Sequence, residues 1–173
     1  MRLARSESLR RGAAAVELAV VLPFLVILVV GVWEIGRLIQ LQQIMNNAAR
    51  DGARLASQAT IVTPTGSYVE IATNTGSPNV TAAITQYLQA AGIQNLTGLQ
   101  ISFTFLNGDT SLTQPYQGLK NQQFIVQVSL PYANLRWTNL SLINPTTLSG
   151  QCVWQMLVDD PFTVSSSLPG WSP

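Results

Sequence analysis

The longest apolar stretch of the chain lies close to its N-terminus and runs from Leu18 to Trp33. It contains no charged residue, and the apolar residues 13–16 extend it backwards past a single carboxylate, Glu17. Together they amount to about 20 residues, the length that an α-helix needs to cross a bilayer core of about 30 Å. A helix packed on a soluble core would show a polar face along its length. The pattern therefore predicts one membrane-spanning helix.

Beyond Trp33 apolar residues still recur at helical spacing, but polar residues separate them. We therefore expect one continuous helix over residues 13–58, whose second half forms a stalk beyond the membrane. Glu34 and Arg37 are three residues apart and are expected to pair across one turn. Small residues then follow at intervals of four, at Ala48, Gly52 and Ala56. Because this spacing lets another backbone approach closely, it predicts a helix-packing seam against another subunit or the protein's own domain. The alternative is an alanine-rich helix that stays exposed.

Residues 59–160 carry the patterns of a small α+β domain. Ser77 suits the N-cap of a second helix, with Pro78 at its first position and Gly92 at its end. Alternation with a period of two predicts about three strands in an antiparallel sheet, covered on one face by this helix. The expected strands are Leu99–Phe105, Phe124–Leu130 and Cys152–Val158, with a shorter one at Tyr68–Thr73. Residues 161–173 are rich in Pro and Ser and are expected to form a flexible tail.

Composition excludes several classes of function. Only 10% of the residues are charged, against about 25% in ordinary soluble domains. From Leu55 onward the chain has two positive and four negative side chains, so no basic surface is available for nucleic acid. The chain has no histidine, which excludes a Ser-His-Asp triad and histidine metal sites, and its one cysteine, Cys152, cannot form a disulfide within the chain. We therefore expect neither an enzyme nor a bound cofactor or metal.

The charges on either side of the apolar stretch predict the orientation of the helix. Four arginines and one glutamate precede the stretch, whereas the charges that follow it nearly balance. Because positive flanks stay in the cytoplasm, we expect residues 1–12 to form a basic cytoplasmic leader and the C-terminal domain to lie outside the inner membrane. A cleaved secretory signal also has a basic head and an apolar core. Here, however, the core is longer than usual, Glu17 interrupts it and no small-x-small cleavage site follows it.

Glu17 stands at the edge of the predicted span, where a carboxylate is unfavourable unless it is paired or reaches water. A cut between Gly12 and Ala13 would make Glu17 the fifth residue of a new N-terminus. The freed amine of Ala13 would then be a positive partner for Glu17 of a neighbouring chain. The alternative is a carboxylate whose side chain reaches the aqueous interface.

The N-terminal third of the chain, from RRGAAAVE at residues 10–17 to AARDGARLAS at residues 48–57, resembles the TadE-like proteins of bacterial tight-adherence (Flp-type) pilus systems. The matching features are the RRGAAAVE sequence, a proline early in the apolar stretch, the Glu34-x-x-Arg37 pair and the small-residue stalk. The resemblance implies a pilin-like fold, in which the long helix packs on a small sheet. It also implies cleavage after Gly12 by a prepilin peptidase and a role for Glu17 in assembly.

These observations lead to one main hypothesis and one alternative. The main hypothesis is a minor pilin or pseudopilin, a structural subunit that takes part in assembling or anchoring a Tad-type (type IV-like) pilus. The resemblance implies that its partners are the inner membrane, other pilins in homo- or hetero-oligomeric assemblies, pilus assembly platform proteins and the prepilin peptidase. The alternative is a single-pass, membrane-anchored extracytoplasmic binding or adhesion module that does not enter a filament.

Overall fold

The structure, a computed structural model, describes the backbone of residues 3–135 and 146–157, and the side chains of these residues from Ala14 onward. Among the described residues, one compact unit holds those up to Leu41 and the other holds those from Gln42 onward. We call the second unit the domain. The predicted tail over residues 161–173 lies outside the described residues.

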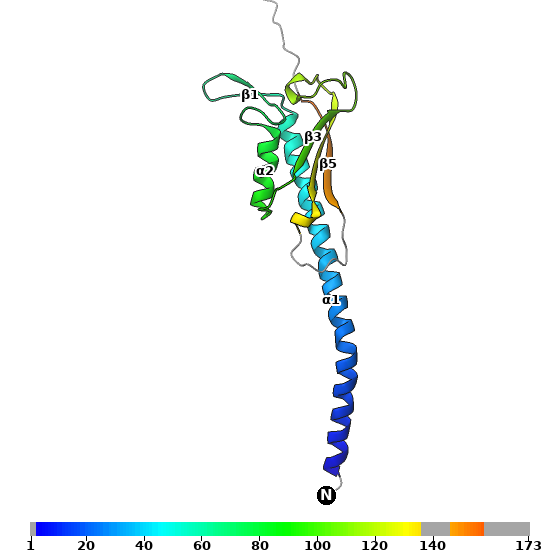
Figure 1. Cartoon of the computed structure of the whole chain (residues 1–173). Coiled ribbons are helices and arrows are strands. Elements are labelled where there is room, and N and C mark those ends of the chain that lie inside the picture. Colours follow the sequence, from blue (N-terminus) through cyan, green and yellow to red (C-terminus); the bar gives the residue numbers. More distant parts are fainter. Residues whose placement is uncertain (1–2, 136–145, 158–173) are drawn as a thin grey trace, which may run out of the picture. The chain divides into compact units, whose positions relative to one another are not determined.

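A single helix, α1 (Leu3–Ala56), continues through both units (Figure 1). It begins ten residues before the predicted start at residue 13, because Leu, Ala, Arg and Glu dominate residues 3–11 and all of them favour helix. Pro23 lies inside α1 without ending it. The helix ends at Ala56, two residues before the predicted end at residue 58.

The domain contains a three-stranded antiparallel sheet with strand order β3-β4-β5. Its strands are β3 (Gln100–Phe105), β4 (Gln123–Pro131) and β5 (Thr147–Gln155). The alternating pattern predicted β3 and β4 to within one residue at each end. One face of the sheet forms the core. There the ring of Phe103 packs against those of Phe105 and Phe124, at centroid distances of 4.9 Å and 5.0 Å.

The prediction for the third strand was wrong at its start, and the strand also ends at Gln155, before the predicted end at Val158. β5 begins at Thr147 rather than at Cys152, so its first half gave no strand signal. The reason is that position 150 on the core face is a glycine, which adds no apolar side chain to the alternation. Leu148 is buried, but no apolar residue follows it on the core face before Cys152.

The second helix, α2 (Val80–Ala90), starts later than predicted. Its N-cap is Asn79, whose side-chain oxygen accepts a hydrogen bond of 2.7 Å from the backbone N–H of Ala82. The predicted cap, Ser77, lies two residues too early, because the asparagine side chain already satisfies the free N–H of the first turn. Gly92, with φ +91°, follows the helix end as predicted.

A second, two-stranded sheet was not predicted as such. It pairs β1 (Thr60–Val62) with β2 (Tyr68–Glu70) in an antiparallel hairpin. The sequence indicated only the second strand, since β1 has just three residues and lies in a Thr/Gly/Pro/Ser-rich segment. Two short 3₁₀ helices, η1 (Pro115–Gln117) and η2 (Tyr132–Asn134), complete the domain. The domain therefore has the predicted α+β class, with five strands in two antiparallel sheets.

Candidate functional site: the N-terminal helix

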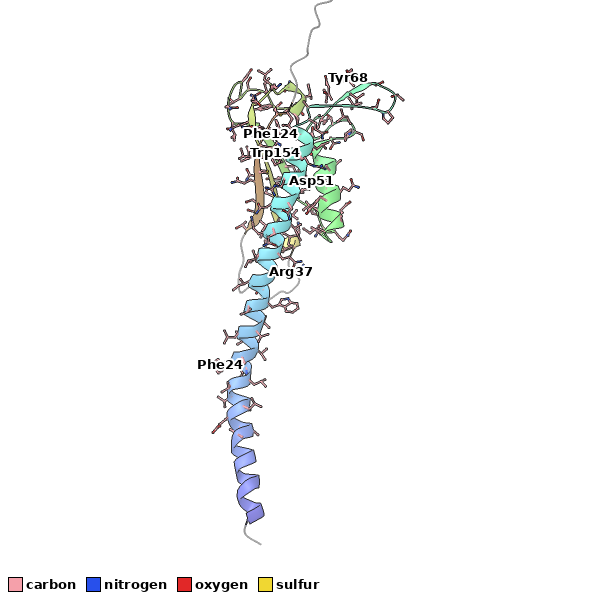
Figure 2. All side chains as sticks on the ribbon, turned by 180° about the vertical axis from the view of Figure 1, so that it is seen from behind. Phe24, Arg37, Asp51, Tyr68, Phe124 and Trp154 are labelled. Carbon is pink, nitrogen blue, oxygen red and sulfur yellow. The ribbon has the colours of Figure 1, made fainter. Side chains whose placement is uncertain are left out.

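The first functional feature is the apolar surface of α1 from Ala14 to Trp33. Among the described residues, α1 is the one helix long and apolar enough to cross a membrane, with a mean hydropathy of 2.8 in its most apolar 18-residue window. No residue of that window is buried. The side chains of Phe24 and Trp33 are 67% and 63% exposed. That of Phe24 projects away from the helix (Figure 2). An uncovered surface of this length and composition matches the hydrocarbon core of a bilayer.

The predicted processing residues lie at the start of this surface. Gly12 and Ala13 are part of the helical backbone of α1, and their side chains are outside the described set. Glu17 lies one turn further along and is exposed. Its carboxylate makes no hydrogen bond or ion pair with any residue described in residues 3–135 and 146–157.

The end of the apolar surface differs from the prediction. Glu34 does not pair with Arg37; the ion pair found between described residues is Arg54–Asp51, at 3.5 Å. The side chain of Glu34 is only 7% exposed, and its Oε2 atom has no hydrogen-bond partner in the described part of the chain. Arg37 is exposed.

The packing seam lies inside the domain. Ala48 and Ala56 are fully buried, and Gly52 is buried between them. A Cβ atom at position 52 would lie 2.6 Å from Cγ1 of Ile84 and 3.3 Å from Cγ1 of Val80, both on α2. Of the two partners that the sequence allowed for the seam, the structure places the protein's own domain against Gly52.

Earlier turns of α1, from Gln42 to Asn46, contact β5. A Cβ atom at Gly150 would overlap the backbone carbonyl of Met45. Close to this point, the side-chain amide of Gln42 donates a 2.6 Å hydrogen bond to the backbone carbonyl of Ser149. The side-chain oxygen of Asn46 accepts one of 3.3 Å from the backbone N–H of Gln151. These contacts place the last four turns of α1 between α2 and the edge strand of the sheet.

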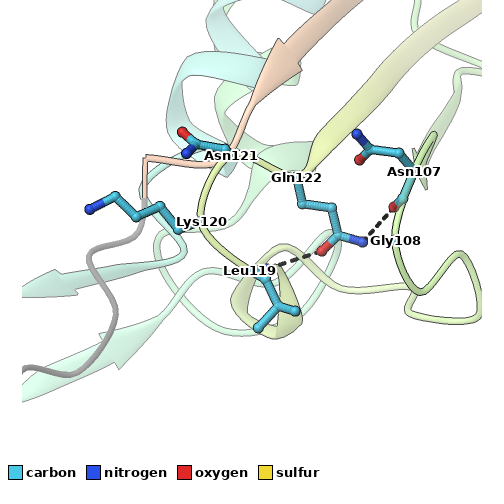
Figure 3. A pocket seen from close by; sticks show the side chains of 6 residues that line it. All are labelled: Asn107, Gly108, Leu119, Lys120, Asn121 and Gln122. Carbon is cyan, nitrogen blue, oxygen red and sulfur yellow. Dashed lines mark hydrogen bonds between the residues drawn. The ribbon is translucent and has the colours of Figure 1, made fainter.

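Sequence reasoning missed Gln122, a buried polar side chain that joins two loop segments, residues 107–109 and 119–122. Its amide nitrogen donates to the backbone carbonyl of Asn107 at 2.8 Å, and its amide oxygen accepts from the N–H of Leu119 at 3.0 Å (Figure 3). The amide nitrogen also donates to the backbone carbonyl of Asp109 at 3.2 Å. The side chain is 6% exposed. All of its bonds go to the protein's own backbone, so the hollow of about 230 Å³ beside it is bordered by a structural residue rather than a reactive one.

The described residues contain no group of three or more His, Cys, Asp or Glu side chains that could hold a metal ion. Asp109 is engaged locally, because its Oδ1 atom accepts hydrogen bonds from the hydroxyl and the backbone N–H of Ser111. These bonds lower the pKa of Asp109. Asp159 and Asp160 lie outside the described residues.

A comparison with known families finds a match within the N-terminal helix. The model of the TadE-like protein family matches residues 12–54, which confirms the resemblance inferred from the sequence. The match begins at the predicted cleavage position, covers the apolar surface and ends among the residues that pack in the domain. Comparisons with curated proteins and with solved structures gave no match.

Proposed function

We propose that the chain is a minor pilin or pseudopilin, a structural subunit that takes part in assembling or anchoring a Tad-type pilus. The observation that carries this proposal is the overlap between the family match and the two parts of α1. Residues 14–33 present an apolar surface that suits a membrane, and residues 42–56 contribute to the core of a folded domain. A chain built in this way attaches a domain to a membrane through one continuous helix.

The proposal includes an orientation and a processing step. The arginines before Glu17 keep residues 1–12 in the cytoplasm, and the domain lies on the other side of the inner membrane. A prepilin peptidase then cuts between Gly12 and Ala13. The cut frees the amine of Ala13, and Glu17 of a neighbouring subunit binds it, which offsets the unfavourable placement of a carboxylate at the membrane edge.

The proposed partners follow from this arrangement. They are other pilins, the pilus assembly platform and the prepilin peptidase. The role is structural and not enzymatic. Support for this comes from the composition of the chain, which has no histidine and a single cysteine.

The mass of the intact protein, extracted from membranes of a host with a Tad system, tests the processing step. We expect a chain that starts at Ala13, and a chain that starts at Met1 when the prepilin peptidase is deleted. The variant Gly12→Leu should keep the leader, whereas the matched variant Gly31→Leu, inside the apolar stretch, should be cut normally. A mature protein that keeps residues 1–12 beside an active peptidase would contradict the proposal.

A second experiment tests the role of Glu17. Glu17→Ala should reduce the amount of surface pili or of pilin-associated protein, while the domain unfolds at the same temperature as in the parent. Glu70→Ala removes an exposed carboxylate in the domain and serves as the matched control. Normal assembly with Glu17→Ala would remove the role that we propose for this residue.

The alternative, a membrane-anchored binding module that does not enter a filament, is favoured by a different observation. One face of the sheet consists of uncharged side chains, most of them polar. Localisation separates the two functions: a pilus subunit is recovered with sheared filaments, whereas a membrane-only module stays with the inner membrane.

A further inference from the structure

The face of the three-stranded sheet that points away from the core carries no charged side chain. On all three strands, buried residues alternate with residues on this open face, and the register aligns the open positions in rows across the sheet. The open face is formed by Gln100, Ser102, Thr104, Gln123, Ile125, Gln127, Ser129, Thr147, Ser149, Gln151, Val153 and Gln155. Exposed protein surfaces ordinarily mix charges of both signs, so a face of this size without any charge is unusual.

The rows of this face have a regular composition. Ile125 lies opposite Val153 and forms an apolar row across β4 and β5. A pair of glutamines flanks this row on each side: Gln123 with Gln155, and Gln127 with Gln151. The result is a strip of hydrocarbon with amide groups along both of its sides.

A hollow of about 350 Å³ lies on β3 and β4 and is lined by Gln100, Ile101, Ser102, Gln127 and Ser129. In the described part of the chain, the amides of Gln100 and Gln127 and the hydroxyls of Ser102 and Ser129 make no hydrogen bond with another residue. Their donors and acceptors therefore face solvent and are available to a ligand. Each amide offers two N–H donors and a carbonyl acceptor, and each hydroxyl both donates and accepts.

Charge and area decide which kind of ligand fits. Without positive side chains, the face has no attraction for nucleic acid or anionic lipid. Three strands about 4.8 Å apart and up to nine residues long at about 3.4 Å each give a platform of roughly 400 Å². Two copies joined through this face would bury about 800 Å², less than the roughly 1,200–2,000 Å² of a stable interface. A second copy of the chain is therefore a poor occupant.

We infer that this face binds a neutral oligosaccharide. Sugar hydroxyls donate and accept hydrogen bonds, which matches the amides of Gln100 and Gln127 and the hydroxyl of Ser102. The C–H surface of a pyranose ring matches the apolar row of Ile125 and Val153 beside them. The hollow holds one end of the saccharide chain, and the glutamine rows follow its length. This function goes beyond pilus assembly and does not depend on cleavage of the leader.

Affinity electrophoresis of the full-length protein in a neutral detergent tests the inference. The probes are three neutral polysaccharides (dextran, mannan and hydroxyethyl cellulose) and one anionic polysaccharide, alginate. We expect at least one neutral polysaccharide to retard the protein, to the same degree at low and high salt, while alginate does not. Retardation by none of the three neutral probes would overturn the inference.

Variants then locate the site. The double variant Ser102→Ala/Gln127→Ala should lower the affinity for the retarding polysaccharide at least tenfold, and Gln100→Lys should lower it in an otherwise intact domain. Gln86→Ala/Gln89→Ala, on the exposed side of α2, is the matched control and should bind like the parent. Equal retardation of the parent and of both site variants would also overturn the inference. Because the altered side chains are exposed or border the hollow, unfolding temperatures should stay unchanged.

Discussion

The backbone of Met45 lies against the Cα atom of Gly150, so closely that a Cβ atom at position 150 would overlap the Met45 carbonyl group. Met45 is fully buried, and Gly150 is on the core face of β5 opposite Val128. The contact joins a helix to a strand about a hundred residues later in the chain. The packing therefore requires a glycine at position 150. The backbone conformation does not require one, because the φ of Gly150 is not positive.

Gly150→Ala should therefore destabilise the domain by about 1–3 kcal/mol or more, because a main-chain group cannot rotate away as a side chain can. Thermal unfolding of the detergent-solubilised chain, followed by near-UV circular dichroism, measures the change. Ser149→Ala is the matched control: its side chain is exposed, and the effect should stay within about 0.5 kcal/mol. An unchanged transition in Gly150→Ala would show that the helix does not pack here.

Gly52 and Ile84 form the second close contact of α1. Alanine favours a helix by about 1 kcal/mol over glycine, but a Cβ atom 2.6 Å from Ile84 introduces overpacking of about 1–3 kcal/mol. We expect the overpacking to dominate, so that Gly52→Ala lowers the unfolding free energy of the domain by about 1 kcal/mol. Gly36→Ala has open space around its Cβ and should cause no loss.

A double-mutant cycle checks that the loss arises from this contact. Ile84→Ala alone should cost about 2–5 kcal/mol. Combined with Gly52→Ala, the two changes should cost less than their sum, because the shortened side chain leaves room for the new methyl group. Additive losses would mean that Gly52 and Ile84 do not press on one another.

The position of the domain boundary gives a third prediction. A fragment over residues 59–173 lacks the buried residues Met45, Ala48, Ala49, Ala53 and Ala56, which belong to the core of the domain. It should not unfold cooperatively, whereas a fragment over residues 40–173 should. Hydrogen exchange of the amides of β4 measures the difference. Strong protection in the shorter fragment would contradict the assignment of α1 to the core.

The thiol of Cys152 gives a prediction about pH. Burial raises the pKa of Cys152 above its ordinary value, and the nearby Arg50 opposes that rise. Because only the thiolate reacts with iodoacetamide, the pH midpoint of alkylation should be higher in the folded chain than in the chain unfolded by guanidinium. Arg50→Gln should move the midpoint higher still, and Arg54→Gln, on an exposed arginine, should leave it unchanged. A lower midpoint in Arg50→Gln would contradict the role of the guanidinium.

Local patterns were enough to predict the class of the fold. The apolar stretch gave the long helix, and the alternation around Phe103 and Val126 gave two strands almost to the residue. These elements are visible because their side chains alternate or recur within a few positions. The start of β5 was not visible, because it depends on the contact of Gly150 with a distant helix.

The candidate site could be predicted only in part. The position of Glu17 and the spacing of Ala48, Gly52 and Ala56 could be predicted, but an internal seam could not be distinguished from one between subunits. That choice depends on where α2 packs, which is a tertiary relationship. The expected Glu34–Arg37 pair did not form, because spacing on a helix permits a pair but does not require one. The structural role of Gln122 could not be predicted, because a single glutamine in a polar loop forms no sequence pattern. Its role depends on the tertiary contacts of the loops around it.

The continuity of α1 through the core of the domain restricts how this chain can vary during evolution. Inserting or deleting one residue after Gln42 would rotate the rest of the helix by about 100° and shift it by about 1.5 Å. After an insertion, Asn47 and Asp51 would take the positions of Ala48 and Gly52, and the side chain of Asp51 cannot fit against Ile84. Changes of length before Gln42 leave this packing intact. Homologous chains should therefore differ in length on the membrane side of the helix and keep a constant length from Gln42 to Ala56.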